Sequence, residues 1–483
     1  MKSIFLTLVA LLVMVSASHA QPAFEHRSLE EALNPDGTLK RGVQGSFKAE
    51  GYQMRTGANG EPIFLPQTQN TTTGTWDTQF GLPNGVARNN LVGHVYALAV
   101  DGQGNIYIGG SFTQAGGVVA RSVARYNPQT NTWSALGTGA QNGVDVGSGG
   151  IGVVYALAID GSGRVYVGGN FTQAGGVSAN YVARFDPATN TWTTLGTGAQ
   201  NGVSGSGFST AVYALAIDGS GKVYVGGRFT QAGGVSANSV ARFDPATNTW
   251  TTLGTGAQNG VSGSGFSTAV YALAIDGSGK VYVGGRFTQA GGVSANSVAR
   301  FDPATNTWSA LGTGTQNGVS GGVLALAIDG SGRVYVGGEF SQAGGVSAHR
   351  VAHFDPLANS WMALGTGSNN GVGGGSVNAL AILGNEIYVG GTFALAGGLN
   401  GMSANHVAKF SSTTNSWSIL GTSNSYGVSN GNVSALIAVG SDVYVGGNFT
   451  QAGEVSVNSL ARYSSPTNTW HRVGDGNGVN NQV

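Results

Sequence analysis

The 483-residue chain contains no cysteine, and only 9% of its residues are charged. The absence of cysteine excludes disulfides, thiolate metal ligands, cysteine nucleophiles and a lipid-modified N-terminal cysteine. The 22 basic and 22 acidic residues balance, so the sequence lacks the basic excess that is typical of nucleic-acid binding. Beyond the first 20 residues, no apolar run is long enough to span a bilayer. We therefore expect no nucleic-acid partner and no membrane span.

Residues 1–20 have the pattern of a secretory signal peptide. Lys2 supplies the positive start, an apolar stretch runs from Ile4 to Val15, and small residues end at Ala20. The apolar stretch is too short to serve comfortably as a membrane anchor. The sequence therefore predicts cleavage before Gln21 and a secreted protein, either extracellular or periplasmic.

One repeat accounts for most of the 84 glycines. The glycines have no three-residue period, which excludes collagen, and the 41% apolar content is sufficient for a packed core. Tryptophans recur 53 to 59 residues apart, at Trp76, Trp133, Trp192, Trp250, Trp308, Trp361, Trp417 and Trp470. Each interval contains four short runs of β-branched and aromatic residues bounded by turn residues. In the third copy these runs are Val212–Asp218, Val223–Gly227, Val240–Pro245 and Thr249–Leu253.

The repeat predicts an all-β fold, a seven-bladed β-propeller of four-stranded antiparallel blades over residues 71–483. A four-stranded sheet cannot cover both of its faces alone, whereas radial stacking of such sheets does so. An open solenoid usually needs atypical capping repeats, and no strong cap is recognisable. Seven full copies start near Val95, Val154, Val212, Val270, Val323, Val377 and Val433.

Two details of each copy carry further expectations. The first run is apolar without a break, as in Val212–Ile217, which predicts a strand covered on both faces. The second run ends in a double glycine, as at Gly226 and Gly227. Glycine permits a positive φ and close backbone approach, so we expect a sharp exit from the strand against a neighbour.

Residues 21–70 differ in composition from the repeats and are predicted to be an extension or spacer. Ser28–Leu33 is a short helical candidate with Ser28 as its cap and Glu31 three residues later. Tyr52–Phe64 has the pattern of a β-hairpin.

The strand predicted around Trp76 competes with the strand around Trp470 for one sheet edge. Either the seventh blade carries an extra strand, or the propeller has eight blades with a degenerate N-terminal one. The sequence leaves both alternatives open.

The double glycine and the segment Phe243–Trp250 (Phe-Asp-Pro-Ala-Thr-Asn-Thr-Trp) resemble the kelch repeat, over about residues 76–475. That repeat has a double glycine after its second strand, a Tyr or Phe in the third and a Trp in the fourth. The resemblance implies a propeller of the kind found in secreted bacterial repeat proteins, and it implies little about activity. The pattern departs at the turn after the third strand, where Asp-Pro becomes Asn127-Pro128, Ser411-Ser412 and Ser464-Ser465 in three copies.

The long connections of every copy are predicted to lie on one face. Segments such as Arg228–Ser239 join the second strand to the third, and segments such as Gly254–Thr268 join successive copies. Antiparallel strands alternate in direction, so both kinds of segment reach the same side, which we call the long-loop face. Loops on a rigid scaffold often carry binding groups.

The residue after each double glycine is the candidate binding position on the long-loop face. These residues vary between copies whose flanking residues are nearly identical, and solvated loop residues free to vary are the alternative explanation. They are Ser111, Asn170, Arg228, Arg286, Glu339, Thr392 and Asn448.

We identify no catalytic residue, no metal site and no cofactor from the sequence. His349, His353 and His406 lie in adjacent copies without a carboxylate at ligand spacing. The turn aspartates offer one carboxylate each, too few for calcium, and are expected to cap their own turns; they are Asp101, Asp160, Asp218, Asp276 and Asp329. Glu339, Glu386 and Glu454 show no sign of forming the acid pair that a glycosidase needs.

The leading hypothesis is an exported, non-enzymatic binding or scaffold propeller whose ligand is a glycan or an extracellular protein. The alternatives are a polysaccharide-acting enzyme with a site on the same face, and a purely structural surface protein. Copies three and four, Gly202–Thr251 and Gly260–Trp308, are nearly identical. Such repetition suits a multivalent or structural surface better than a single catalytic centre.

Overall fold

The computed structural model describes residues 27–28, 32–35, 40, 47–48, 52–56, 62–66 and 85–474, except 89–90, 140–141, 148–149, 206–209, 264–267 and 423–424. The chain divides into two units, Met1–Asp77 and Thr78–Val483. The predicted signal peptide and Trp76 lie outside the described residues, so the boundaries at residues 20 and 70 stay predictions. Among the described helices, none has the length and apolar character that crossing a bilayer requires.

The N-terminal unit contains two small sheets. Strand β1 (Arg27–Ser28) pairs in parallel with β2 (Phe47–Lys48), and β3 (Tyr52–Thr56) pairs antiparallel with β4 (Pro62–Pro66). The predicted hairpin is therefore confirmed. The helix candidate Ser28–Leu33 lies partly outside the described residues, and Ser28, its predicted cap, is extended in β1, as a cap residue normally is. This helix therefore stays a prediction.

Seven four-stranded antiparallel sheets repeat in the second unit among its described residues, and each is formed by the four longer strands of one repeat in chain order. A further four-stranded sheet consists of strands of two or three residues and belongs to the small sheets described below. We number these sheets one to seven. The first strands are β7 (His94–Val100), β14 (Val153–Ile159), β21 (Ala211–Ile217), β28 (Ala269–Ile275), β34 (Val323–Ile328), β41 (Val377–Leu383) and β50 (Val433–Val439). The second strands are β8 (Ile106–Ser111), β15 (Val165–Asn170), β22 (Val223–Arg228), β29 (Val281–Arg286), β35 (Val334–Gly338), β42 (Glu386–Gly391) and β51 (Asp442–Gly447).

The outer strands of the seven sheets follow the same order. The third strands are β11 (Val123–Asn127), β18 (Val182–Asp186), β25 (Val240–Asp244), β32 (Val298–Asp302), β38 (Val351–Asp355), β45 (Val407–Ser411) and β54 (Leu460–Ser464). The fourth strands are β12 (Thr132–Ala135), β19 (Thr191–Thr194), β26 (Thr249–Thr252), β33 (Thr307–Ala310), β39 (Ser360–Ala363), β46 (Ser416–Ile419) and β55 (Thr469–Arg472).

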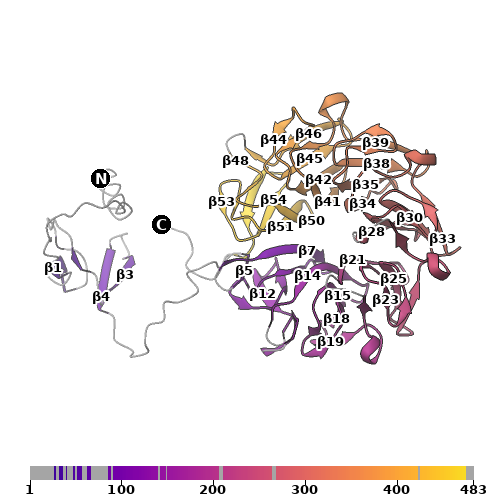
Figure 1. The fold of residues 1–483 in the computed structure, drawn as a ribbon. Coiled ribbons are helices and arrows are strands. Elements are labelled where there is room, and N and C mark those ends of the chain that lie inside the picture. The colour runs from indigo at the N-terminus through magenta and orange to yellow at the C-terminus, as the bar shows by residue number, and fades with distance from the viewer. Residues whose placement is uncertain are drawn as a thin grey trace, which may run out of the picture. The chain divides into compact units, whose positions relative to one another are not determined.

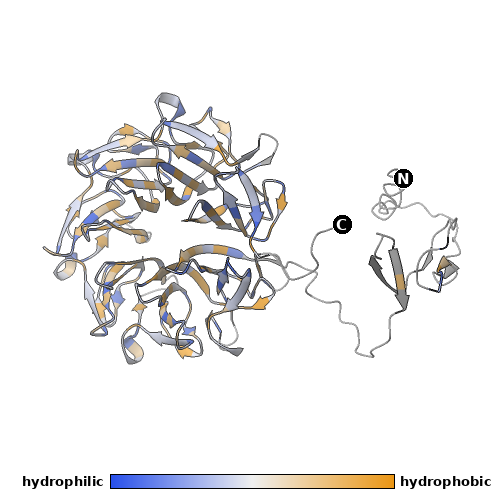
Figure 2. Cartoon of the chain, turned by 180° about the vertical axis from the view of Figure 1, so that it is seen from behind, coloured by the Kyte–Doolittle hydropathy of each residue, from blue (hydrophilic) through white to orange (hydrophobic). Residues whose placement is uncertain are grey.

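The hydrophobic core lies between neighbouring sheets. The first strands are the innermost, and each contacts the first strand of the next sheet (Figure 1). Apolar residues recur along the strands of every sheet (Figure 2). Between the second and third sheets, for example, buried Tyr166 and Val182 pack with Val212 and Trp250. A similar cluster joins the first sheet to the seventh, where Val95 packs with residues of β51 and β54, and β7 contacts β50.

The repeat tryptophans in β19, β26, β33, β39, β46 and β55 tie each sheet to the one before it. Trp250 is 7% exposed, and its Nε1 donates to the Leu195 carbonyl of the preceding sheet at 3.0 Å. The same bond recurs at the other five, with distances of 3.0 to 3.2 Å. These six tryptophans, each 6 to 8% exposed, are therefore core residues.

The second strand runs one residue past the double glycine in four of the seven sheets and ends at its second glycine in β35, β42 and β51. Strand β22 continues through Gly226 and Gly227 to Arg228, and neither glycine has a positive φ. The expected close approach is present: a Cβ on Gly226 would meet Val270 of the next sheet, and one on Gly227 would meet the Ala211 carbonyl. Space, rather than a special backbone conformation, therefore requires glycine here.

The segments predicted as long polar loops contain short strands. In the third repeat, β23 (Gln231–Ala232) and β24 (Val235–Ser236) form a hairpin, and β20 (Val203–Ser204) from the preceding segment pairs with β23. Gly233 and Gly234 have φ of 57° and 80°, as a tight two-residue turn requires. This Gly-Gly turn was the sequence signal for the hairpin.

Similar small sheets accompany the other repeats. Their strands are β5 (Val86–Arg88), β6 (Leu91–Val92), β9 (Gln114–Ala115), β10 (Val118–Val119), β13 (Val144–Asp145), β16 (Gln173–Ala174), β17 (Val177–Ser178), β27 (Val261–Ser262), β30 (Gln289–Ala290), β31 (Val293–Ser294), β36 (Gln342–Ala343), β37 (Val346–Ser347), β40 (Val372–Gly373), β43 (Leu395–Ala396), β44 (Met402–Ser403), β47 (Gly421–Thr422), β48 (Ser425–Tyr426), β49 (Val428–Ser429), β52 (Gln451–Ala452) and β53 (Val455–Ser456). Four 3-10 turns lie between sheets, at Gly198–Gln200, Gly256–Gln258, Gly314–Gln316 and Gly367–Asn369.

Candidate ligand-binding surface

Every first strand contains a β-bulge near its start. In β21 the register shifts between Val212 and Ala214, so that Tyr213 has no partner residue in β22. A bulge bends its strand and redirects a side chain, and bulges are common next to functional sites. The residues at this position are Tyr96, Tyr155, Tyr213, Tyr271, Leu324, Asn378 and Ser434.

The bulge tyrosines form one continuous row, which we call the tyrosine row (Tyr96, Tyr155, Tyr213 and Tyr271). Successive ring centroids are 5.2, 5.4 and 5.3 Å apart. All four side chains are half-buried. The expectation that the first strand is covered on both faces therefore holds for Val212 and Ala214 but not for Tyr213.

His94 extends the row and links it to the seventh sheet. Its ring stacks on Tyr96 at 3.9 Å, and its Nε2 lies 3.0 Å from the Ser434 hydroxyl. Burial lowers the pKa of His94 to about 4, so the ring is neutral at pH 7. Burial raises the pKa values of Tyr96, Tyr155 and Tyr213. These rings are therefore uncharged near neutral pH.

The hydroxyl groups of the tyrosine row make no hydrogen bond to any described residue. Each phenol is both a donor and an acceptor. The row lies at the long-loop face, because Tyr213 is two residues from Ala211, and Ala211 pairs with Arg228 at the end of β22. The arrangement offers aromatic faces and free hydroxyl groups to a ligand on that face.

The structure separates the seven predicted binding residues into different environments. Ser111 is buried and accepts a hydrogen bond from Arg88, and Thr392 and Asn448 bond within their own sheets to Ser376 and Asn432. Asn170 is exposed at the end of β15.

Arg286 and Glu339 are brought together across the fourth and fifth sheets. They form an ion pair in which both side chains remain nearly half exposed. The Glu339 carboxylate raises the pKa of Arg286. The charge of Arg286 is thereby balanced by its neighbour.

Arg228 lines a pocket of about 290 Å³ between the connections of the third and fourth sheets. Thr210, Ser239 and Thr268 are among the other lining residues, and no acidic residue is among the described lining residues. Burial raises the pKa of Tyr213, while the positive charge of Arg228 acts in the opposite direction. Ala211, two residues before Tyr213 in β21, pairs with Arg228, so Arg228 and the tyrosine row lie at the same end of the third sheet.

Sequence reasoning missed the tyrosine row, His94 and Arg88. Arg88 comes from β5, before the first full repeat, and donates to Ser111 at 3.1 Å. The sequence signal that could have found the tyrosine row was variation between repeats. The bulge residue changes from Tyr to Leu, Asn or Ser, while the Val before it and the Ala after it are invariant. The same test had selected the residue after the double glycine.

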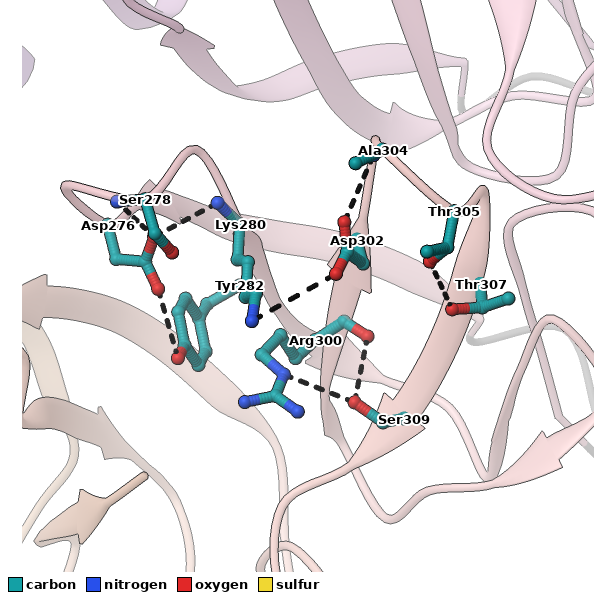
Figure 3. A network of polar contacts seen from close by, with 10 residues as sticks. All are labelled: Asp276, Ser278, Lys280, Tyr282, Arg300, Asp302, Ala304, Thr305, Thr307 and Ser309. Atoms are coloured by element: carbon teal, nitrogen blue, oxygen red, sulfur yellow. Dashed lines mark hydrogen bonds and ion pairs between the residues drawn. The ribbon is translucent and has the colours of Figure 1, made fainter. Parts of the chain in front are cut away.

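The opposite face, where short turns join the strands, is built from local polar contacts. In the fourth sheet, Asp276 Oδ1 accepts hydrogen bonds from the backbone N–H groups of Ser278 and Lys280, while Lys280 Nζ lies 4.0 Å from Asp302 (Figure 3). The prediction that these aspartates cap their own turns is confirmed. The His, Asp and Glu side chains within the described ranges form no group of three that could hold a metal ion.

The three histidines considered from the sequence lie in different environments. His353 is on β38 beside Tyr335, with ring centroids 5.4 Å apart, and its pKa is lowered by burial. His406 has a φ of 72° next to β45, and burial lowers its pKa as well. The backbone N–H of His349 donates to Asn370.

The repeats match a family model. A domain of unknown function described as a β-propeller, DUF5122, matches residues 104–129, 161–188, 219–246 and 277–304. The chain carries a β-propeller domain. Each match covers the turn between the first and second strands, the second strand, the double glycine and the third strand, so it recognises the same segment in the first four repeats.

Solved propeller structures resemble the chain at low identity. The extracellular domain of a hybrid two-component system protein from B. thetaiotaomicron is 13% identical, with a TM-score of 0.48 over 79% of this chain. This chain spans only 39% of that one. Virginiamycin B lyase from Staphylococcus aureus is 9% identical over 77% of this chain and 94% of its own, with a TM-score of 0.45.

A third similar structure is YCF48 bound to D1 peptide, 11% identical over 79% of this chain and 93% of its own, with a TM-score of 0.44. A comparison with curated proteins finds no match.

Proposed function

We propose that the chain is an exported, closed seven-bladed propeller of the kelch-like type that binds a glycan through the tyrosine row, without catalysing a reaction. Seven four-stranded sheets and the packing of β50 against β7 support a closed ring of seven blades. The signal-peptide pattern of residues 1–20 supports export.

The tyrosine row is the observation that carries the proposed binding function. Four adjacent aromatic rings with unpaired hydroxyl groups offer both a stacking surface and hydrogen bonds, which together suit the apolar faces and hydroxyl edges of sugar rings. The rings of His94, Tyr96, Tyr155 and Tyr213 are uncharged at neutral pH, so stacking a sugar ring on them leaves no charge of these rings buried and unpaired.

Carboxylates around the row are scarce. Among the bulge residues and the residues after the double glycines, Glu339 is the single acid, and it is paired with Arg286. Glycoside hydrolysis ordinarily requires two carboxyl groups facing the scissile bond. This scarcity supports binding over catalysis.

A glycan-array screen of the purified secreted protein tests the proposal. The variant Tyr213→Ser/Tyr271→Ser uses the residue that the seventh sheet carries at the same position, Ser434. We expect it to lose about tenfold or more in affinity, since each aromatic contact contributes about 0.5–1.5 kcal/mol.

Tyr181→Ser is the matched control, because Tyr181 lies outside the row and serine occupies the equivalent positions 239 and 297 with φ of 64° and 63°. Unchanged binding by the double variant would contradict a role for the row. Absence of any glycan signal would contradict glycan binding itself.

A further inference from the structure

Two arginines in identical sequence contexts have different surroundings. Residues 202–250 and 260–308 are identical, so Arg228 and Arg286 have the same neighbours along the chain. Arg286 forms an ion pair with Glu339 of the fifth repeat, whereas Arg228 lines the pocket between the third and fourth sheets. At the position after the double glycine, the following repeat supplies Glu339 in the case of Arg286 and a second arginine, Arg286, in the case of Arg228.

The pocket has the chemistry of an anion site. Its described lining combines Arg228 with the hydroxyl-bearing residues Thr210, Thr230, Ser239 and Thr268. Thr210 and Ser239 are only 7% and 6% exposed, so packing holds these residues in place. Guanidinium groups bind carboxylates and sulfates in a bidentate manner, and hydroxyl groups add further donors. No acid in the described lining opposes an anion.

The pocket is large enough for a charged group together with part of a sugar ring. Its volume of about 290 Å³ equals that of about ten water molecules in the liquid. Tyr213 lies two residues from Ala211, which pairs with Arg228. A ligand whose ring stacks on the tyrosine row can therefore place a charged substituent in the pocket.

We infer that the ligand is an acidic glycan and that its carboxylate or sulfate binds at Arg228, in the pocket between the third and fourth sheets. The inference rests on the proposed glycan-binding function and specifies its ligand class. Arg286 contributes little, because Glu339 already balances its charge.

Calorimetric titration of the full secreted protein with three probes tests the inference: oligogalacturonate, the same oligosaccharide as its methyl ester, and a sulfated dextran oligosaccharide. We expect an acidic probe to bind about tenfold or more tightly than the ester, with an advantage that shrinks as salt is added. Comparing the affinities for oligogalacturonate and for the sulfated dextran oligosaccharide shows whether the pocket prefers a carboxylate or a sulfate.

Arg228→Asn is the decisive variant, since the second sheet carries Asn170 at the same position. We expect it to remove the preference for the acidic probe while retaining binding of the ester. Arg286→Asn is the matched control and should change the affinity by less than about twofold. Glu339→Gln should increase the affinity for the acidic probe several-fold, because it releases the charge of Arg286. A thermal unfolding curve confirms that each variant is folded.

The outcomes distinguish the two proposals. Equal binding of acid and ester, with both lost in Tyr213→Ser/Tyr271→Ser, would overturn the anion site and leave glycan binding intact. Equal losses in Arg228→Asn and Arg286→Asn would also overturn it, since diffuse charge would then explain the preference. If no probe binds and the glycan array gives no signal, both the anion site and the glycan-binding function are overturned.

Discussion

The contact between the second and third sheets differs from the contact between the seventh sheet and the first. In the former, Trp250 Nε1 donates to the Leu195 carbonyl at 3.0 Å. At the latter, the equivalent nitrogen of Trp133 is buried and has no hydrogen-bond partner among the described residues. We refer to these as the internal seam and the closing seam.

Three hydrogen bonds at other positions join the first repeat to the seventh at the closing seam. Ser459 Oγ donates to the Gly93 carbonyl at 2.6 Å, His94 Nε2 lies 3.0 Å from Ser434 Oγ, and the backbone N–H of Val86 donates to the Asn458 carbonyl at 3.1 Å. The last of these reproduces the bond from Val203 to Asn180 at the internal seam. The N-terminal strand β5 thus takes the place of the connecting segment that other sheets receive from the preceding repeat. The comparison shows that the contact between the seventh and first sheets has hydrogen bonds on the long-loop side but lacks the bond of the outer tryptophan.

The largest expected effect is the loss of an internal-seam tryptophan. Trp250→Ala removes a buried ring and its hydrogen bond, and should lower the free energy of unfolding by ~3–5 kcal/mol. Trp133→Ala should cost less, because Trp133 is partly exposed and lacks the bond. Urea denaturation of both variants measures the difference. Equal losses would show that the two seams are energetically alike.

A glycine substitution tests the closing seam directly. A Cβ on Gly446 would collide with Val95 of the first sheet, just as one on Gly226 would collide with Val270. If the closing seam is packed in solution, Gly446→Ala and Gly226→Ala should each cost ~1–3 kcal/mol. A neutral Gly446→Ala beside a destabilising Gly226→Ala would mean that the seventh and first sheets are not in contact.

Removing only the indole N–H sharpens the comparison. Trp250→Phe leaves the Leu195 carbonyl without its donor and should cost ~1 kcal/mol more than Trp133→Phe, which breaks no bond. Thermal unfolding of the two variants at one pH measures this difference. A larger loss for Trp133→Phe would reveal a partner for its nitrogen that the described residues do not provide.

The smallest expected effect is a pH dependence of the closing seam. Burial lowers the pKa of His94 to about 4, whereas the unfolded chain binds the proton near pH 6.5. The contribution of neutral His94 to the free energy of unfolding is therefore fully present above about pH 6.5, and it is lost as the pH falls toward 4.

After allowance for solvent screening, protonation of His94 should lower the free energy of unfolding by an amount on the order of 1 kcal/mol. His353 and His406 shift in the same direction, so the test is the difference between wild type and His94→Asn. The variant should show a shallower fall in melting temperature over this range, and His471→Asn, on the edge strand β55, is the control. Parallel curves for wild type and His94→Asn would exclude His94 as the cause.

The strands were largely predictable because each repeat shows its pattern seven times. The predicted start at Val212 lies one residue inside β21, and the predicted Trp250 strand coincides with β26. The bulge at Tyr213 was not predictable from periodicity, because an extra residue in one strand is defined only by its partner strand. The ion pair of Arg286 with Glu339 depends on a side chain 53 residues away in the next sheet.

The identity of the third and fourth repeats has a consequence for folding kinetics. Strands β22 and β29 have the same sequence and the same registers with their partners, so β25 can pair with either at equal local energy. Only the length of the connecting chain favours the native partner, through a smaller entropy of loop closure. Chains in which the two repeats have exchanged strands must unpair before folding is complete, so the middle of the molecule is where misassembled intermediates should accumulate.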